Sequence, residues 1–374
     1  MKQVVIAGYA RTPFTLANKG ELARVRPDDL AATAVKGLMT KIGVDANEIE
    51  DLIMGCAFPE GEQGFNIARL VVLMAGLPLS IAGVTVNRFC GSSMQGIHQA
   101  AGAIQMNAGH AFICAGVESM SRVPMAGFNP SPNPKLYETM PNAYISMGLT
   151  AENLAKSYHI SRQEQEAFAV ASHQKAAAAQ QAGKLADEIV PVGAVTQDGC
   201  IRPETTLETL AGLKLAFDER GSVTAGTSSP LTDGASATLV CSEAFAKAHG
   251  LPILARIKSI AVSGCAPEIM GIGPVLSSQK ALQRAGLSVK DLDIIELNEA
   301  FSAQSLACIH DLGLDLAKIN LDGGAIALGH PLGATGARIT GKAAALLKRE
   351  GKQFALATQC IGGGQGIATI LEAV

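Results

Sequence analysis

The sequence predicts an α/β fold that is duplicated along the chain and interrupted by one large insertion. Strand-like and helix-like segments alternate up to about residue 118, the alternation stops there, and it resumes after residue 232. Such alternation favours parallel strands covered by helices. The resumed part repeats a spacing found in the first part, which indicates an internal duplication.

The first part supplies most of the alternation. Short apolar segments predict strands, the third of them buried, at 4–8, 49–55, 81–86 and 111–116. Helical spacing of apolar residues predicts helices at 28–42, 62–75 and 91–106. Asp28 or Asp29 is the expected N-cap of the first helix.

The insertion runs from Ser119 to about Thr232. It opens with the proline- and asparagine-rich run 128–134, and a long alanine-rich helix is predicted at about 161–182. Ser161 and Glu164 have the spacing of a capping box at the start of that helix. A long and otherwise irregular segment of this kind is typical of a lid over a binding site.

The duplication rests on matched positions. Residues 31–53 contain a predicted helix, then Gly43, Ile49 and a strand. Residues 277–296 contain the same series, with Gly286 and Leu292 at the matching positions. The spacing from Gly43 to Ile49 equals the spacing from Gly286 to Leu292. A later strand, 354–360, ends at a cysteine before a glycine-rich turn, much as the strand at 81–86 leads to a cysteine. We therefore expect two similar halves related by a pseudo-twofold axis.

Composition and charge argue against several classes of function. The 374 residues are 48% hydrophobic and 17% charged, with a net charge of −3. Neither nucleic acid nor an anionic membrane surface is an expected partner of such a chain. No apolar run approaches the roughly 20 residues that a membrane-spanning helix needs.

Cytoplasmic localisation is the expectation from the termini and the cysteines. The first eight residues lead straight into a strand without a leader pattern, and the last four are not a peroxisomal signal. The eight cysteines include no C-x-x-C pair, so neither structural zinc nor a disulfide framework is expected. A reducing compartment suits such a set of thiols.

Cys90 lies where the strand at 81–86 gives way to the helix at 91–106. Free backbone amides and the positive end of the helix dipole meet at such a junction. The thiol is therefore expected to ionise more easily than a free one, and the thiolate is the nucleophilic form. The alternative is a small residue chosen for packing at a helix start.

His330 lies in the glycine-rich segment 320–336, where backbone can approach a ligand closely. A histidine between Gly329 and Pro331 is poorly placed for core packing, so we expect a role in acid–base catalysis. The alternative is a phosphate-binding glycine loop, but the P-loop motif is absent. A helix is predicted to follow at about 336–347.

The segment 360–366 offers a second exposed thiol, Cys360, with free N–H groups that suit an oxyanion hole. The alternative, a dinucleotide fingerprint, needs another glycine register and more chain than the eight residues that remain. A further polar group, Glu296, Asn298 and Glu299, ends a buried strand. It is either part of a site or a hydrogen-bonded polar cluster.

In this order, these segments resemble those of the thiolases, acyl-CoA acyltransferases of the 3-ketoacyl-CoA thiolase type. The resemblance runs along essentially the whole chain, and its matching strings are 87–92, 298–301, 329–333 and 360–364. It implies a duplicated five-layered α/β/α/β/α fold with an inserted loop domain. The implied divisions are a half at 1–118 plus 233–252, a loop domain over coenzyme A at 119–232, and a half at 253–374.

The resemblance also implies a role for each reactive residue. Cys90 would accept the acyl group as a thioester, and His330 would take the thiol proton. Cys360 would act as acid and base at the α-carbon of acetyl-CoA. Asn298 would hold a water that, with His330, faces the thioester oxygen. The amides of Cys90 and Gly362 would stabilise the oxyanion on the acylated cysteine.

The implied substrates are coenzyme A and acyl-CoA, with no tightly bound cofactor and no metal. By resemblance, Ser229 would contact the pantetheine and Arg202 would lie near the adenine. The apolar coenzyme contacts would be Met147, Phe217, Met270 and Phe301.

The implied reaction is thiolytic cleavage of 3-ketoacyl-CoA by coenzyme A, or the reverse condensation. Ser146-Met147-Gly148 stands where some short-chain thiolases carry His-Met-Gly, and the segment near 120–145 is shorter than in that type. Both differences favour a degradative enzyme of fatty acid β-oxidation with a broader chain-length range. A homodimer or homotetramer is usual in the family, and a β-oxidation partner subunit is left open.

Two other functions remain open. A decarboxylating ketoacyl synthase shares the fold, but it would have two histidines at the site, and this chain has Asn298 and Cys360 where the functions of the second histidine would be served. A non-catalytic scaffold that binds coenzyme A or lipid would not need the four reactive positions to be intact.

Overall fold

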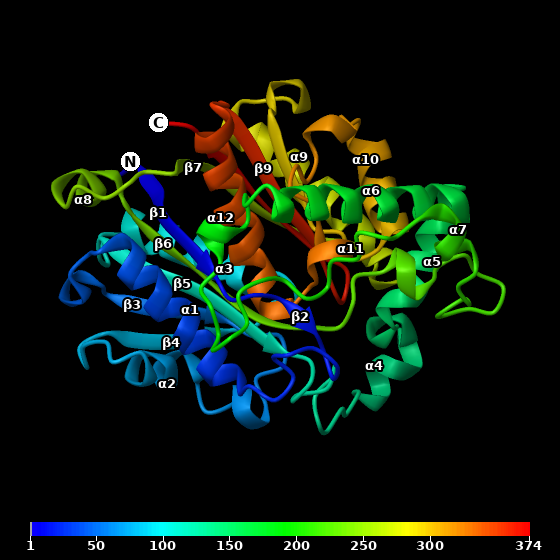
Figure 1. Cartoon of the computed structure of the whole chain (residues 1–374), viewed down its shortest axis with the longest axis horizontal. Coiled ribbons are helices and arrows are strands. Elements are labelled where there is room, and N and C mark those ends of the chain that lie inside the picture. Colours follow the sequence, from blue (N-terminus) through cyan, green and yellow to red (C-terminus); the bar gives the residue numbers. More distant parts are fainter. Residues whose placement is uncertain (1) are drawn as a thin grey trace.

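Ten strands pair into one continuous sheet in the structure, a computed structural model that describes residues 2–374 (Figure 1). The strand order is β4-β3-β5-β6-β1-β7-β10-β9-β8, and β2 pairs with β6. The strands are β1 (Val4–Arg11), β2 (Thr15–Leu16), β3 (Asp51–Gly55), β4 (Ala82–Val86), β5 (Ala111–Ser119), β6 (Thr232–Ser242), β7 (Ala255–Gly264), β8 (Ile294–Leu297), β9 (Phe354–Ile361) and β10 (Gln365–Glu372).

The two ends of this sheet are parallel and its centre is antiparallel. β3 is parallel to β4 and β5, and β8 is parallel to β9. β6, β1, β7 and β10 run antiparallel to their neighbours. The prediction of parallel strands is therefore correct where helices connect the strands, and wrong for the centre, where β1 pairs with β7 and joins the two halves.

The helices complete five layers, as predicted. α1 and α2 cover one face of the first half of the sheet, α3 and α12 lie between the halves, and α9 covers the outer face of the second half, with α10 packed against α9. The helices are α1 (Pro27–Ile42), α2 (Ile67–Met74), α3 (Ser92–Gln105), α4 (Pro134–Thr139), α5 (Met147–Ser157), α6 (Arg162–Gln181), α7 (Leu207–Ala211), α8 (Glu243–Ala248), α9 (Gly273–Ala285), α10 (Ser302–Leu312), α11 (Ala325–Leu328) and α12 (Leu332–Glu350).

The matched spacing in the sequence corresponds to matched structure. α1 ends at Gly43 with φ of 69°, and α9 ends at Gly286 with φ of 68°. This left-handed conformation favours glycine at a helix end. Each helix is followed by a short 3-10 turn and then by a strand of a parallel pair, β3 or β8.

The start of α12 lies very close to the first half of the sheet. A Cβ on Gly116 of β5 would come 2.1 Å from the carbonyl oxygen of Gly333. A Cβ on Gly336 would come 2.3 Å from the backbone nitrogen of Met94 in α3. Glycine at these positions lets the loop that carries His330 pack directly against the elements that carry Cys90.

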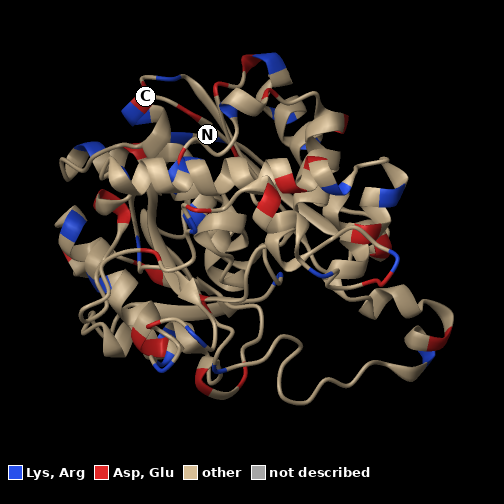
Figure 2. Ribbon diagram, turned by 45° about the vertical axis from the view of Figure 1, so that its right-hand side comes forward, with Lys and Arg blue, Asp and Glu red and all other residues tan. Residues whose placement is uncertain are grey.

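The insertion adds α4 to α7 over one end of the sheet. α6 has the predicted capping box between Ser161 and Glu164, and it packs on α10, α11 and α7. α4 lies on an excursion that extends away from the body of the molecule (Figures 1 and 2).

Three helix starts differ from the predictions. Arg26, not Asp28 or Asp29, is the N-cap of α1, because Pro27 occupies the first helical position, which tolerates proline. α2 begins at Ile67, five residues later than predicted, and a 3-10 turn precedes it. α12 begins at Leu332, directly after the His330-Pro331 pair, rather than at about residue 336.

The prediction that the strand before Cys90 is buried is wrong. β4 is an edge strand of the sheet, and the Val84 side chain is 40% exposed. Acidic and basic residues are interspersed along the ribbon (Figure 2). No helix within residues 2–374 is long and apolar enough to cross a membrane.

Candidate active site

Cys90 lies in a tight turn between β4 and α3. Phe89, just before it, has φ of 41°, a conformation that costs a bulky residue about 1–3 kcal/mol and is typical of functional sites. Ser92 holds the turn: its hydroxyl accepts from the Arg88 N–H at 2.9 Å and donates to the Phe89 carbonyl at 2.6 Å. The turn is therefore fixed by its own backbone and by the first helical residue.

The second half of the fold also holds this turn. The Gln359 side-chain amide on β9 donates to the Cys90 carbonyl. Arg88 donates to the Gln365 side chain on β10 at 2.8 Å. Cys90 thus lies at the junction of the two halves, beside the glycine-rich turn that contains Gly362.

The Cys90 thiol is not predisposed to ionise. Burial raises its pKa to about 12, and the negative Glu118 acts in the same direction. The backbone N–H groups of Gly362 and of Cys90 itself lower the pKa but do not offset the burial. The expectation of an easily ionised thiol at a helix start is therefore wrong, because loss of solvation outweighs the favourable amides and the helix dipole.

His330 is held in one orientation by threonine hydroxyls. Its backbone N–H donates to Thr232 Oγ1 at 3.0 Å, and its Nδ1 lies 2.6 Å from Thr335 Oγ1. The Thr335 hydroxyl donates its own proton to the Pro331 carbonyl at 3.0 Å. Thr335 must therefore accept from Nδ1–H, which leaves Nε2 as the unprotonated, basic nitrogen.

Nε2 of His330 faces Asn298. The Asn298 amide nitrogen lies 3.4 Å from Nε2, and the Asn298 backbone N–H donates to the Thr358 carbonyl of β9 at 3.0 Å. Burial, and to a smaller extent the positive Arg338, lower the pKa of His330 to about 3. The imidazole is therefore neutral at physiological pH and available as a base.

Cys360 lies one residue before the end of β9, in an apolar cluster. Its thiol is buried, so the expectation of an exposed thiol is wrong, because the side chains of this cluster cover it. The members of this cluster are Met147, Ala151, Val223, Met270, Ala300, Phe301 and Cys360. Burial raises the pKa of Cys360 well above the ordinary value for a thiol, and the neighbouring thiol of Cys90 raises it further. Cys360 is therefore a protonated thiol that can donate to a carbanion.

The structure brings most of the predicted coenzyme contacts to this cluster. Phe217 packs edge-on against Phe301, with 5.8 Å between ring centroids. The Ser229 hydroxyl donates to the Ala300 carbonyl at 3.1 Å. Met147 faces Gly362: a Cβ on that glycine would come 3.4 Å from the methionine sulfur.

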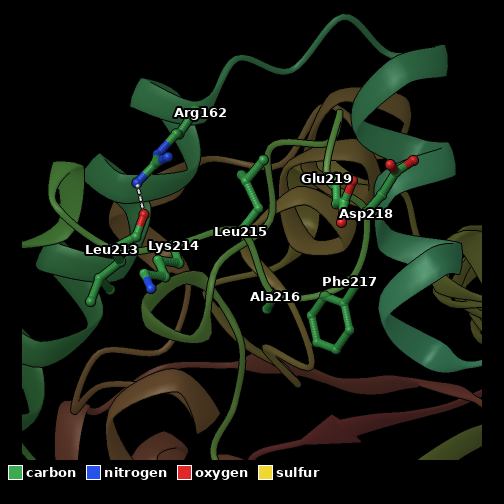
Figure 3. A pocket seen from close by; sticks show the side chains of 8 residues that line it. All are labelled: Arg162, Leu213, Lys214, Leu215, Ala216, Phe217, Asp218 and Glu219. Atoms are coloured by element: carbon green, nitrogen blue, oxygen red, sulfur yellow. Dashed lines mark hydrogen bonds between the residues drawn. The ribbon is translucent and has the colours of Figure 1, made fainter.

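Arg202 stands apart from this group. Its side chain is exposed, and its backbone N–H donates to His173 Nδ1 at 3.2 Å. A surface cavity of about 490 Å³ lies on the insertion, lined by Arg162 and by residues 213–219 (Figure 3). Phe217 is the one predicted contact residue among those lining it.

Glu118 is a buried residue that the sequence analysis did not single out. Its carboxylate accepts from the backbone N–H groups of Ala57 and Gly333 at 2.8 and 2.9 Å, and from the Gln63 side chain at 2.7 Å. Burial raises its pKa. Glu118 thereby ties the end of β5 to the start of α12, close enough to Cys90 for its charge to act on the thiol.

Glu299 has a similar structural role. It accepts from the Ser172 hydroxyl at 2.6 Å, from the Asn320 side chain at 2.7 Å and from the Ile326 N–H at 3.2 Å. It therefore anchors α6 of the insertion to the loop before α11. Of the two interpretations of this polar strand end, the hydrogen-bonded cluster holds for Glu299, while Asn298 joins the site.

Comparisons with known proteins agree along the whole chain. The family models for the thiolase N-terminal domain and the thiolase C-terminal domain match residues 4–244 and 251–373. The chain belongs to the thiolase family. Its thiolase relatives include the 3-ketoacyl-CoA thiolases of Shewanella oneidensis, 53% identical, and Shewanella frigidimarina, 54% identical, each over the full length of both chains.

Solved thiolases have the same fold. The crystal structure of human mitochondrial 3-ketoacyl-CoA thiolase superposes with a TM-score of 0.92 at 39% identity, covering 100% of this chain and 99% of that one. The same human enzyme in complex with CoA gives a TM-score of 0.92, with 98% of that chain covered. Within residues 2–374 no cluster of three or more metal-ligating side chains is found.

Proposed function

We propose that this thiolase cleaves 3-ketoacyl-CoA with coenzyme A, giving acetyl-CoA and an acyl-CoA shortened by two carbons. The observation that carries the proposal is the junction of the two halves. The Cys90 and Cys360 thiols, one from each half, are neighbours there, and the neutral His330 presents its unprotonated Nε2 to Asn298. Full-length similarity to proteins named 3-ketoacyl-CoA thiolase supports the same reaction.

In the first half-reaction, Cys90 Sγ attacks the 3-keto carbon as its proton passes to His330 Nε2. Because the thiol is protonated at rest, transfer of this proton accompanies the attack. The bond between the α-carbon and the keto carbon then breaks, leaving an acyl group on Cys90 and the enolate of acetyl-CoA. Cys360 donates its proton to the enolate carbon, and acetyl-CoA leaves.

Two groups stabilise the negative charge that develops in these steps. The N–H groups of Gly362 and Cys90, which already favour negative charge on Sγ, suit the oxyanion on the acylated cysteine. The enolate oxygen would be stabilised by His330 and by a water held on Asn298. The buried Asn298 Oδ1, which has no partner among the described protein groups, supports a water at this position.

The second half-reaction returns the enzyme to its starting state. His330 passes its proton to the Cys360 thiolate, which resets both groups. Coenzyme A then attacks the acyl carbonyl and gives its thiol proton to His330, and Cys90 leaves as a thiolate that takes that proton back. Every proton is recovered, so no net acid or base is consumed.

Coenzyme A is proposed to reach Cys90 beneath the insertion. Met147, Met270, Phe301 and Ser229 would line its pantetheine arm, since they surround Cys360 and Gly362. Phe217 connects this group to the cavity in Figure 3, where the nucleotide end would lie.

Self-association and localisation are further parts of the proposal. The edge strand β4 exposes Val84, and Leu79 just before it is 75% exposed, so a homodimer or homotetramer would cover this apolar edge. The eight free cysteines suit a reducing cytoplasm. Light scattering of the purified protein measures its oligomeric state, and fractionation of the source cells tests its localisation.

The test of the proposed function is thiolysis of acetoacetyl-CoA. The wild type is expected to release acetyl-CoA, and Cys90→Ala to lose turnover by several orders of magnitude because the covalent step is absent. Full thiolysis by Cys90→Ala would overturn the proposal. A decarboxylating synthase would instead release CO₂ from a malonyl thioester, and a scaffold would bind coenzyme A without any turnover.

A further inference from the structure

We propose that Gln359 is a positioning residue for the acylation of Cys90. Its side-chain amide holds the turn that carries the Cys90 thiol against the strand that carries Cys360. Gln359 itself gives and takes no proton in the reaction, because it acts through the backbone of Cys90. This inference rests on the proposed function, since its effect is expressed in the transfer of an acyl group to Cys90.

The turn at Cys90 is strained and needs support from its surroundings. Phe89 has φ of 41°, and such a backbone persists only where neighbouring groups hold it. Within the first half, the Asn87 side chain accepts from the Phe89 N–H at 2.8 Å, and the Ser92 hydroxyl accepts from the Arg88 N–H at 2.9 Å. These two side chains hold the N–H groups before Cys90, but neither contacts the Cys90 carbonyl.

The Cys90 carbonyl receives its hydrogen bond from the second half of the fold. Within the described part of the chain, its one donor is the amide nitrogen of Gln359. Gly91, the next residue, packs on the same pair of strands: a Cβ there would come 2.5 Å from Ile361 and 3.2 Å from Ile367. Alternate residues of a strand share a face, and Gln359 pairs with Ile367 across the hairpin. Gln359 therefore lies on the face of β9 against which the Cys90 turn rests.

The Gln359 side chain occupies a position where an amide is unfavourable for packing. It is fully buried, and its Oε1 has no hydrogen-bond partner among the described protein groups. A buried acceptor without a partner destabilises a fold, and such a group in a native structure calls for an explanation. The contact with the Cys90 carbonyl supplies that explanation, because an apolar side chain of the same shape could not make it.

The same short segment of chain also carries two other groups of the site. Cys360 follows Gln359 directly and lies in the apolar cluster described above. The N–H of Gly362, two residues further on, reaches the sulfur of Cys90. Gln359 therefore fixes the nucleophile relative to both the acid and an oxyanion donor. A misplacement of about 1 Å can cost about 10²-fold in rate, so release of the Cys90 carbonyl should slow acylation.

The experiment measures how fast Cys90 takes an acetyl group from acetyl-CoA, by rapid quenching and peptide mass spectrometry. It compares the wild type with Gln359→Met and Gln165→Met. Gln165 in α6 is the matched control: it is also fully buried, donates to the Ser222 hydroxyl at 2.9 Å, and has an Oε1 without a partner among the described protein groups. The acetylation rate is expected to fall about 10–100-fold in Gln359→Met and to stay within about twofold of the wild type in Gln165→Met.

Two further measurements separate positioning from a purely structural role. Gln359→Met removes one unpaired oxygen, Oε1, and leaves another, the Cys90 carbonyl, without its donor. These two effects on stability oppose each other, so the urea midpoint should stay close to the wild-type value. The KM for coenzyme A should also stay near the wild-type value, because the substitution leaves the proposed coenzyme contacts intact.

Acetylation of Gln359→Met at the wild-type rate, or an equal loss in Gln165→Met, would overturn the inference. A slower rate that accompanies a lower urea midpoint would make Gln359 a stabilising residue only, and would overturn it as well. If the wild type itself takes no acetyl group and cleaves no 3-ketoacyl-CoA, the proposed function fails. A wild type that acylates normally and a Gln359→Met variant that equals it defeat only the inference about Gln359.

Discussion

At the residue scale, the proposed site contains a neutral thiol and a neutral imidazole. Burial raises the pKa of Cys90 to about 12 and lowers that of His330 to about 3, so an ion pair is strongly disfavoured at rest. The nucleophile is therefore generated during attack and not before it. The orientation of the imidazole then decides whether the proton can move, and Thr335 sets that orientation.

Thr335→Val is expected to lower kcat about 10–100-fold with little change in KM for coenzyme A. Valine keeps the shape but cannot accept from Nδ1–H, so the tautomer with a free Nε2 loses its support. Thr335→Ser keeps the hydroxyl and should retain activity within a few-fold. Steady-state kinetics of both variants provide the check, and a serine variant as impaired as valine would refute the tautomer argument.

Local sequence context singles out Cys90, His330 and Cys360 as candidates, because each stands at a strand end or in a glycine-rich loop. Thr335 and Glu118 could not be singled out in the same way. Thr335 reaches the imidazole because α12 starts at Leu332, four residues earlier than the sequence suggested. The lowered pKa expected for Cys90 is also wrong. The sequence shows that Cys90 lies at a helix start, but it does not show how strongly the folded chain removes the thiol from water.

At the element scale, the reactive groups are placed by close contacts between backbones. Glu118 joins β5 to α12, and Gly116 lets the same two elements touch. The repeat in the sequence predicted that two βα units exist, but not that they share one sheet through β1 and β7. Such contacts depend on tertiary packing, which a single sequence does not specify.

Gly116→Ala is expected to lower the free energy of unfolding by about 3 kcal/mol, because the new Cβ would lie 2.1 Å from the Gly333 carbonyl oxygen. Activity should fall too, since His330 lies three residues before that carbonyl. The matched control is Gly102→Ala in α3, where a Cβ meets nothing within 4 Å and alanine should stabilise by about 0.5–1 kcal/mol. Urea unfolding measures the free energy of unfolding of both variants. Equal values for Gly116→Ala and Gly102→Ala would contradict the close packing of Gly116 against Gly333.

At the scale of the whole molecule, several histidines are buried without charge. Burial lowers the pKa of His98 and His330 to about 3 and that of His173 to about 4, from the ordinary 6.5. Below pH 6.5 the unfolded chain binds protons that the folded chain does not, so each of these groups destabilises the fold in acid. Burial raises the pKa of Glu296 to about 7, which acts in the opposite direction.

His98→Gln isolates one of these contributions. Among the described residues, the His98 side chain has one hydrogen bond, between its Nε2 and the Thr369 hydroxyl at 2.8 Å. Glutamine can replace that bond. Between pH 7.5 and pH 5 the wild type should lose about 2 kcal/mol more unfolding free energy than His98→Gln. Denaturant unfolding at the two pH values measures the difference, and identical pH dependences would contradict a neutral buried His98.

In the proposed reaction the two cysteines have separate duties: Cys90 holds the acyl group, and Cys360 moves a proton at carbon. Peptide mass spectrometry after incubation with acetyl-CoA tests this directly in the wild type, Cys90→Ala and Cys360→Ala. We predict an acetyl group on Cys90 in the wild type and in Cys360→Ala, with no acetoacetyl-CoA formed by Cys360→Ala. An acetyl group on Cys360, or none on Cys90, would contradict the account.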